Sequence, residues 1–242
     1  MLKKQEFSRE FEYFTNVDID RIQNNYMVPI FEDIIKKYRF YNILDYGCGN
    51  GLFGAFFKEK IQCKLTGVDG SPYGLKKASE RGYDETILIS DFSTIDLPSE
   101  NETFDFVICK DVLEHLLNPS KVIQESHRVL SRNGKLLIHV PNHFSLVDVV
   151  KFLFTRNIDT QHYFPNANDW NFPHIRFFSF SGLVEGLEKA GFEMIGNYSF
   201  HFARLFCHFN RLPFMKNIFT KLACWSPDNF SAGFSILLKK RD

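Results

Sequence analysis

The chain lacks the features that mark several broad classes of protein. Its 242 residues include 29 Lys and Arg against 29 Asp and Glu, so no net charge draws it to nucleic acid or to an anionic membrane. It has no apolar run of about 18 residues or more, so we expect no membrane-spanning helix. The lysines near its start are followed by no apolar region, and we therefore expect no signal peptide.

Paired cysteines are also missing. The chain has an odd number of them, and no two are separated by only two residues. This pattern argues against a disulfide framework and against a structural zinc site, and it favours a cytoplasmic protein with reduced thiols. The cysteines are Cys48, Cys63, Cys109, Cys207 and Cys224.

No metal-ligand motif stands out either. His139 and His143 are four residues apart, but Pro141 between them prevents the helix that would place both on one face. We therefore predict no metal centre.

The order of apolar runs indicates one α/β domain over residues 1–242. A chain of this length can bury a full core. Short apolar runs alternate with helical segments, the pattern of a parallel, doubly wound sheet. The predicted strands are residues 42–45, 64–69, 86–90, 104–109, 135–140, 192–198 and 231–238. Helix N-caps are predicted at Ser71, at Asn118 and at either Ser179 or Ser181.

Three regions are expected to cover the sheet rather than to build it. Residues 1–40 form a helical cover, in which apolar residues at 19–38 recur with a helical period and Pro29 must kink or split the helix. Residues 144–173 are long for a plain connection, so we interpret them as a lid. Residues 200–229 are aromatic and basic, which suits a lid or a dimer surface and also allows a weak contact with a membrane surface.

Residues 43–51 are the most informative segment for function. A short apolar run there ends in Asp45, and glycines follow at alternate positions. This predicts a buried strand that passes through a tight turn into a helix N-terminus, where backbone N–H groups can approach a ligand. A glycine-rich connection with no ligand is the alternative.

Acidic residues at the ends of the next strands favour a ligand site. Asp69 ends the second predicted strand, 18 residues after the last glycine of the turn, a spacing at which an acid meets ribose hydroxyls. Asp91 and Phe92 end the third strand and offer an acceptor beside a flat ring, and Asp111 follows the fourth. Because the carboxyl ends of parallel strands meet at one edge of a sheet, these acids point to a nucleoside site.

In this order the motifs resemble those of class I S-adenosylmethionine-dependent methyltransferases of the type 11 and type 23 subgroups. Those subgroups include ubiquinone-biosynthesis O-methyltransferases and methionine-biosynthesis proteins of the MetW type. The resemblance covers about residues 40–195 and implies a Rossmann-like, mostly parallel seven-stranded sheet with its last strand antiparallel. It is carried by Asp45-x-Gly47-x-Gly49-x-Gly51, Gly67-Val68-Asp69-Gly70-Ser71, Ser90-Asp91-Phe92, Val112-Leu113-Glu114-His115-Leu116 and His174-x-Arg176-Phe177-Phe178-Ser179.

The resemblance implies that the chain binds S-adenosyl-L-methionine and releases S-adenosyl-L-homocysteine. The glycines would admit the methionine part, with Asp45 facing its ammonium group. Asp69 would bind the ribose hydroxyls and Asp91 the adenine amine. Phe92 would contact the base, and Lys110 would offer its carbonyl oxygen while its side chain points away. The implied cofactor-binding residues are Asp45, Gly47, Cys48, Gly49, Gly51, Asp69, Gly70, Asp91, Phe92 and Lys110.

Three histidines are the candidate catalytic residues. Because sulfonium is a good leaving group, the protein mainly has to align the reacting atoms and exclude water. A base is needed only for a poorly acidic hydroxyl or a protonated amine. His143 is the first candidate because it follows the fifth strand, and His174 and His115 are the others. A helix-capping or core role is the alternative for each. We predict transfer to oxygen of a small-molecule or glycan- or lipid-linked acceptor by a monomer or homodimer.

Two other classes of protein remain as alternatives. A nicotinamide-dependent dehydrogenase also uses a glycine turn and an acid, but it predicts neither Asp91-Phe92 nor Leu113-Glu114-His115. A non-catalytic cofactor-binding or scaffold protein stays open, because the resemblance lies mainly in the cofactor half.

Overall fold

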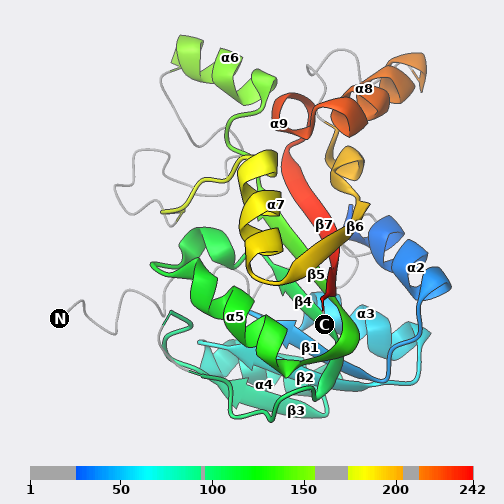
Figure 1. Ribbon diagram of the computed structural model, residues 1–242, viewed down its shortest axis with the longest axis vertical. Coiled ribbons are helices and arrows are strands. Elements are labelled where there is room, and N and C mark those ends of the chain that lie inside the picture. The colour runs from blue at the N-terminus through cyan, green and yellow to red at the C-terminus, as the bar shows by residue number, and fades with distance from the viewer. Residues whose placement is uncertain (1–25, 94–95, 156–173, 204–212, 242) are drawn as a thin grey trace.

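A central sheet with helices on both faces organises the molecule (Figure 1). The computed structural model describes residues 26–93, 96–155, 174–203 and 213–241. Within those ranges the sheet has seven strands, and the predicted α/β fold class is confirmed. The strands are β1 (Asn42–Tyr46), β2 (Lys64–Asp69), β3 (Glu85–Leu88), β4 (Phe104–Lys110), β5 (Leu130–Pro141), β6 (Phe192–Asn197) and β7 (Gly233–Lys240).

The strand order is β3-β2-β1-β4-β5-β7-β6. Neighbouring strands from β3 to β5 pair in parallel, whereas β7 is antiparallel to both β5 and β6, as predicted. After β1 the chain moves outward to β2 and β3, and it then returns to the other side of β1 as β4. This reversal lies between β1 and β4, and in such sheets ligands bind at the carboxyl ends of the strands that flank it.

Alternating side chains bury both faces of the sheet. In β4, Val107 and Cys109 belong to one apolar cluster with α5 (Pro119–Val129) and α7 (Phe180–Lys189). Phe106 and Ile108 belong to a second cluster with α2 (Met27–Lys37), α3 (Leu52–Lys60) and α4 (Pro72–Glu80). Helices on both faces explain why the strand is a continuous apolar run rather than an alternating one.

Most predicted element boundaries lie within two residues of those observed. The main exception is β5, which was expected to begin at residue 135 and instead begins at Leu130. Leu130 pairs with Phe104 across the sheet, and its carbonyl oxygen accepts a hydrogen bond from the Lys240 ammonium group. These are tertiary contacts, which the local sequence does not signal.

Two of the three predicted helix caps are present. The hydroxyls of Ser71 and Ser179 accept hydrogen bonds from backbone N–H groups in the first turns of α4 and α7. Asn118 occupies the predicted N-cap position of α5, but its side chain makes no capping hydrogen bond. Its side-chain Oδ1 accepts instead from the hydroxyl of Ser120, 2.6 Å away.

The helix that covers the sheet before β1 is not kinked in the described residues. It begins at Met27, so Pro29 falls in the first turn, where no backbone N–H is required. The rest of the predicted cover, residues 1–25, lies outside the described ranges. The helix is held by side chains that are almost fully buried: Met27, Ile30, Phe31 and Ile34.

The predicted insertions contribute helices near the carboxyl end of β5 (Figure 1). The first holds α6 (Leu146–Thr155), and residues 156–173 of the expected lid lie outside the described ranges. The second holds part of the 3-10 helix η4 (Ser199–Phe202), then α8 (Pro213–Trp225) and α9 (Pro227–Phe230). Among the described residues, no helix is both long enough and apolar enough to cross a membrane.

Candidate functional site

The glycine turn after β1 has a backbone that glycine alone adopts readily. Gly47, Gly49 and Gly51 have φ angles of 79°, 52° and 79°. The N–H of Gly47 and that of Cys48 both donate to the carbonyl oxygen of Val68, at 2.8 and 3.0 Å. The turn is thereby fixed to the end of β2.

The three glycines differ in what surrounds them. A Cβ on Gly51 would lie 2.6 Å from the Cα of Ala78 in α4, so that glycine is required for packing. A Cβ on Gly49 would meet nothing within 4 Å. The space beside Gly49 is therefore open, and a ligand can approach the backbone there.

Asp69 joins the turn to the start of α4. Its Oδ2 accepts from the Gly49 N–H at 2.7 Å, and its Oδ1 accepts from the Ser71 N–H at 2.8 Å. Burial raises the pKa of its carboxyl group, although these hydrogen bonds act in the opposite direction. Each carboxylate oxygen has a second lone pair, so Asp69 retains the capacity to accept from ligand hydroxyls. Gly70 lies between Asp69 and Ser71, which are joined by the second of these hydrogen bonds.

Asp45 is a buried acid on the other side of the turn. Burial raises the pKa of its carboxyl to about 6, while the Tyr83 hydroxyl, 2.6 Å from Oδ2, donates a hydrogen bond that favours the ionised form. Cys48 is buried close by, and desolvation raises the pKa of its thiol well above the usual value. Its thiol is thus in the unreactive, protonated form at neutral pH.

Asp91 and Phe92 lie beyond β3. Asp91 is exposed and accepts from the Ser93 N–H at 2.8 Å, which fixes its carboxylate at the turn. The ring of Phe92 packs edge-on against Tyr46, with 5.1 Å between ring centroids. An acceptor and an aromatic ring thus lie just after β3, and the ring reaches Tyr46 at the end of β1.

Lys110 ends β4 beside the turn. Its ammonium group pairs with Asp111 and lies 4.4 Å from the centroid of the Phe53 ring at the start of α3. Asp111 has a φ of 54°, a conformation that is uncommon for residues other than glycine. The positive charge of Lys110 is neutralised locally.

The three histidines chosen from the sequence lie together. His143 Nε2 and His174 Nδ1 are hydrogen-bonded at 2.7 Å. The rings of His115 and His174 meet edge-on with centroids 4.8 Å apart. Burial, with the charges of the two neighbouring histidines, lowers the pKa of His174 to about 3, so its ring is uncharged at neutral pH.

Backbone contacts bring these histidines together from distant parts of the chain. The carbonyl oxygen of Glu114, in the 3-10 helix η3 (Leu113–His115), accepts from the N–H groups of Ile175 and Arg176 at 2.8 and 3.1 Å. The Arg176 guanidinium group donates to the carbonyl oxygens of Leu116 and Leu117. Residue 174 is thereby held against the connection that follows β4.

The histidine cluster adjoins the glycine turn. Val112, two residues before Glu114, is packed so closely on the turn that a Cβ on Gly47 would lie 2.3 Å from its Cγ2. The candidate cofactor residues and the candidate catalytic residues therefore belong to one site, at the carboxyl ends of β1 and β4.

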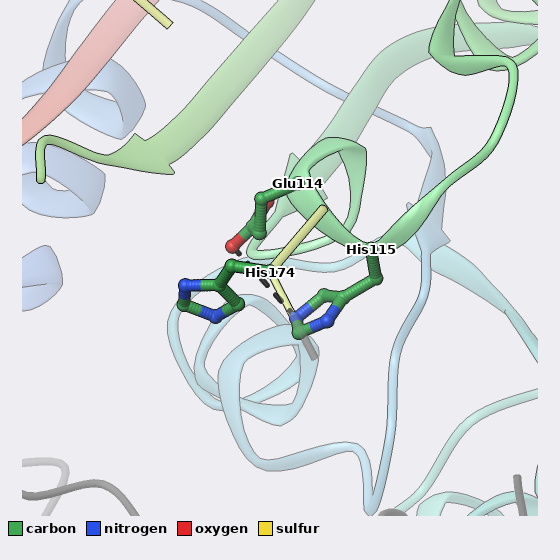
Figure 2. Close-up of side chains that lie close together, drawn as sticks. All are labelled: Glu114, His115 and His174. Atoms are coloured by element: carbon green, nitrogen blue, oxygen red, sulfur yellow. Dashed lines mark ion pairs between the residues drawn. The ribbon is translucent and has the colours of Figure 1, made fainter. Parts of the chain in front are cut away.

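Glu114 is a part of this site to which the sequence analysis gave no role. Its side chain is 1% exposed, and neither carboxylate oxygen has a hydrogen-bond partner on another residue in the described ranges. Desolvation and the charge of Asp111 raise the pKa of the Glu114 carboxyl well above its usual range. Its Oε1 lies 3.9 Å from His115 Nε2, as Figure 2 shows. The Glu-His pair in the connection that follows β4 was the signal that could have identified it.

Comparisons with known proteins give consistent matches. The family profile described as a methyltransferase domain matches residues 11–196. An uncharacterised protein of Methanocaldococcus jannaschii is 32% identical over 152 residues, 63% of this chain and 64% of that protein. A ubiquinone biosynthesis O-methyltransferase of Xanthomonas oryzae pv. oryzae is 32% identical over 41% of this chain and 43% of that protein. The chain thus matches less than two thirds of the length of either relative.

Solved structures share the fold at low sequence identity. An S-adenosylmethionine-dependent methyltransferase from Mesorhizobium loti has a TM-score of 0.60 and 14% identity over 92% of this chain and 100% of that one. A Haloferax volcanii putative methyltransferase complex with the Trm112 activator gives a TM-score of 0.57 and 16% identity over 84% of this chain and 83% of that one. At these identities the likeness concerns the fold.

Proposed function

The chain belongs to the family of S-adenosylmethionine-dependent methyltransferase domains, and from this premise we propose that it transfers a methyl group to oxygen. The acceptor in this proposal is a small molecule or a glycan- or lipid-linked molecule. The observation that carries the proposal is the junction at Val112, which joins the glycine turn to the histidine cluster. A methyl donor on the turn would lie beside groups able to take a proton from a hydroxyl.

The residues around the turn suit S-adenosylmethionine, which supplies a methyl group on a positively charged sulfur. The space beside Gly49 is open, and the buried acids Asp45 and Asp69 flank it. Acids there favour an ammonium group and ribose hydroxyls, whereas they would repel the pyrophosphate of a nicotinamide cofactor. Asp91 and Phe92 offer an acceptor and a ring for an adenine base.

The histidines would hold and move the acceptor's proton. One ring nitrogen of the bonded pair His143 and His174 carries the shared hydrogen, and the other accepts it. We assign His143 as the base and His174 as the residue that orients it. Phe177 packs edge-on against His143, with 5.1 Å between centroids, and helps to exclude water from the pair.

The balance of charge supports the proposed acceptor class. A tRNA U34 carboxymethyltransferase of Campylobacter jejuni is 28% identical over 71% of this chain and 55% of that protein, so a nucleic-acid acceptor is the competing choice. This chain has equal numbers of acidic and basic residues, which gives it no general attraction to a phosphate backbone. A small or conjugated acceptor suits it better.

A matched pair of probes tests the acceptor atom. We expect labelled methyl to pass from S-adenosylmethionine to para-hydroxybenzoate and not to para-aminobenzoate, which differs only in the atom that is offered. His143→Asn should lower the rate by about 10²-fold without changing the affinity for S-adenosylhomocysteine. His127→Asn, remote from the site, is the control. Methylation of the amine alone would contradict the oxygen assignment, and no transfer would favour a non-catalytic binding protein.

A further inference from the structure

Glu114, His115 and His174 form a set of metal-ligand atoms inside the proposed site (Figure 2). One potential ligand atom from each residue lies within 4.8 Å of the other two. One carboxylate and two imidazoles are a donor set used for zinc and for other divalent first-row cations. The side chains come from η3 and from the segment before α7, and the contacts of Glu114 with Ile175 and Arg176 hold these together.

The burial of the Glu114 carboxylate is a second, independent indication of a cation site. A buried carboxylate without a partner is costly, and proteins normally provide one. Glu125 shows the ordinary solution in the same chain: it is 4% exposed, and its carboxylate accepts from the Leu97 N–H and from Arg128. Glu114 is more deeply buried and lacks such partners in the described ranges, while its carboxylate faces two imidazoles. A bound cation would satisfy it.

His143 completes the arrangement. Histidine ligands commonly bond through their second nitrogen to a neighbouring group that fixes the ring. The Nδ1 of His174 bonds to Nε2 of His143 at 2.7 Å, so His174 would bind a cation through Nε2. His143, the proposed base, would thus also fix the His174 ring through their shared hydrogen bond, without itself binding the cation.

We propose that Glu114, His115 and His174 bind one divalent transition-metal cation such as Zn²⁺ or Mn²⁺. Ligand atoms about 2.1 Å from such a cation lie roughly 3 to 3.5 Å apart, so binding would draw the three side chains together by about 1 Å. Three protein ligands leave coordination positions for an oxygen from solvent or from an acceptor.

The cation also deepens the proposed function, on which this step rests. Through Val112 the three ligands adjoin the glycine turn, so a cation there would bind the acceptor hydroxyl next to the methyl donor. A bound cation lowers the pKa of an oxygen that it coordinates, which makes the hydroxyl a better nucleophile. The acceptor would then be a molecule whose reacting hydroxyl is free to become a metal ligand.

Metal binding to the full chain tests the proposal directly. After treatment with EDTA and dialysis, the protein is titrated with ZnCl₂ and with MnCl₂ in a calorimeter, and Co²⁺ is added to read the coordination from its visible absorption. We expect one cation per chain with micromolar or tighter affinity. Glu114→Gln and His174→Asn should weaken binding by at least tenfold and abolish the Co²⁺ bands.

Two controls separate the outcomes. His127→Asn removes a histidine that packs on Phe192 away from the site, and it should bind the cation as the original chain does. Binding of S-adenosylhomocysteine to Glu114→Gln should persist, so a metal-site failure is distinguishable from a failure of the proposed function. Absence of stoichiometric binding, or unchanged binding by Glu114→Gln, would overturn the proposal.

Discussion

Tyr83 supports the buried acid of the glycine turn, and its hydroxyl is the donor that stabilises ionised Asp45. The pKa of Asp45 is about 6 in the folded protein, above its ordinary value of 3.8. Ionisation of Asp45 therefore opposes folding. The stability that protonated Asp45 contributes is fully present below about pH 3.8 and is lost as the pH rises through 6.

Removing the Tyr83 hydroxyl should enlarge that loss. In Tyr83→Phe the pKa of Asp45 rises further, so we expect the free energy of unfolding to fall by about 1–3 kcal/mol at pH 8. The deficit should be smaller at pH 5, where Asp45 is mostly protonated in both folded proteins. Urea denaturation at the two pH values measures it, and Tyr73→Phe, at an exposed position, is the control. An equal deficit at both pH values would contradict the account.

Single residues of the site differed in how well the sequence could predict them. Asp45, Asp69 and the glycines follow from local pattern, because a strand and a tight turn fix where they lie. Tyr83 could not be assigned in this way, and the motif that holds Glu114 did not reveal that its carboxylate is buried. Their roles depend on which side chains lie beside them after folding. Asp45, which Tyr83 contacts, lies 38 positions away in the sequence.

At the scale of elements, the proposed cofactor contact of the glycine turn can be tested by comparing two glycines that have the same kind of backbone conformation. Gly49 and Gly82 both have positive φ, 52° and 91°, and a Cβ on either would meet nothing within 4 Å. Alanine at each should cost about 1–2 kcal/mol of stability. Only Gly49→Ala should also weaken binding of S-adenosylhomocysteine, by tenfold or more, because its methyl group would enter the proposed cofactor space. Calorimetric affinities that fall equally in both variants would refute the placement.

The ends of helices were predictable where a side chain at the end itself makes the capping hydrogen bond. Ser71 caps α4 and Ser179 caps α7, and the observed helices begin directly after them. The start of β5 was not predictable, because Leu130 is drawn into the sheet by Phe104 and Lys240. Asn118 shows the reverse case, in which a residue suited to capping bonds elsewhere.

At the scale of the molecule, β7 should be indispensable because it is the strand that joins β6 to β5. Its side chains Phe234, Ile236, Leu237 and Leu238 are at most 1% exposed. A chain shortened after Ala232 would lose them and would leave β6 without a partner in the sheet. We expect it to lose cooperative urea unfolding and near-ultraviolet circular dichroism. A chain shortened after Lys240 loses little beyond the hydrogen bond from Arg241 to Gly191 and should behave normally.

The parallel, doubly wound sheet was inferred from the alternation of apolar runs, and the antiparallel β7 from family resemblance. The meeting of His115 with His174 was not predictable from local pattern. The two residues are 59 positions apart, and hydrogen bonds from residues 175 and 176 to Glu114 create their contact. Contacts of that range depend on the completed fold.

The position of β7 also has a consequence for synthesis on the ribosome. Strands β2 to β5 can pair as the nascent chain emerges, because each finds a neighbour that has already been made. β6 cannot, since among the described strands it pairs with β7 alone, which begins 36 residues after β6 ends. At about 5–20 residues per second, a newly made β6 waits on the order of seconds with both edges unpaired. That interval is when a chaperone at the exit of the ribosomal tunnel would have most effect on the yield of folded protein.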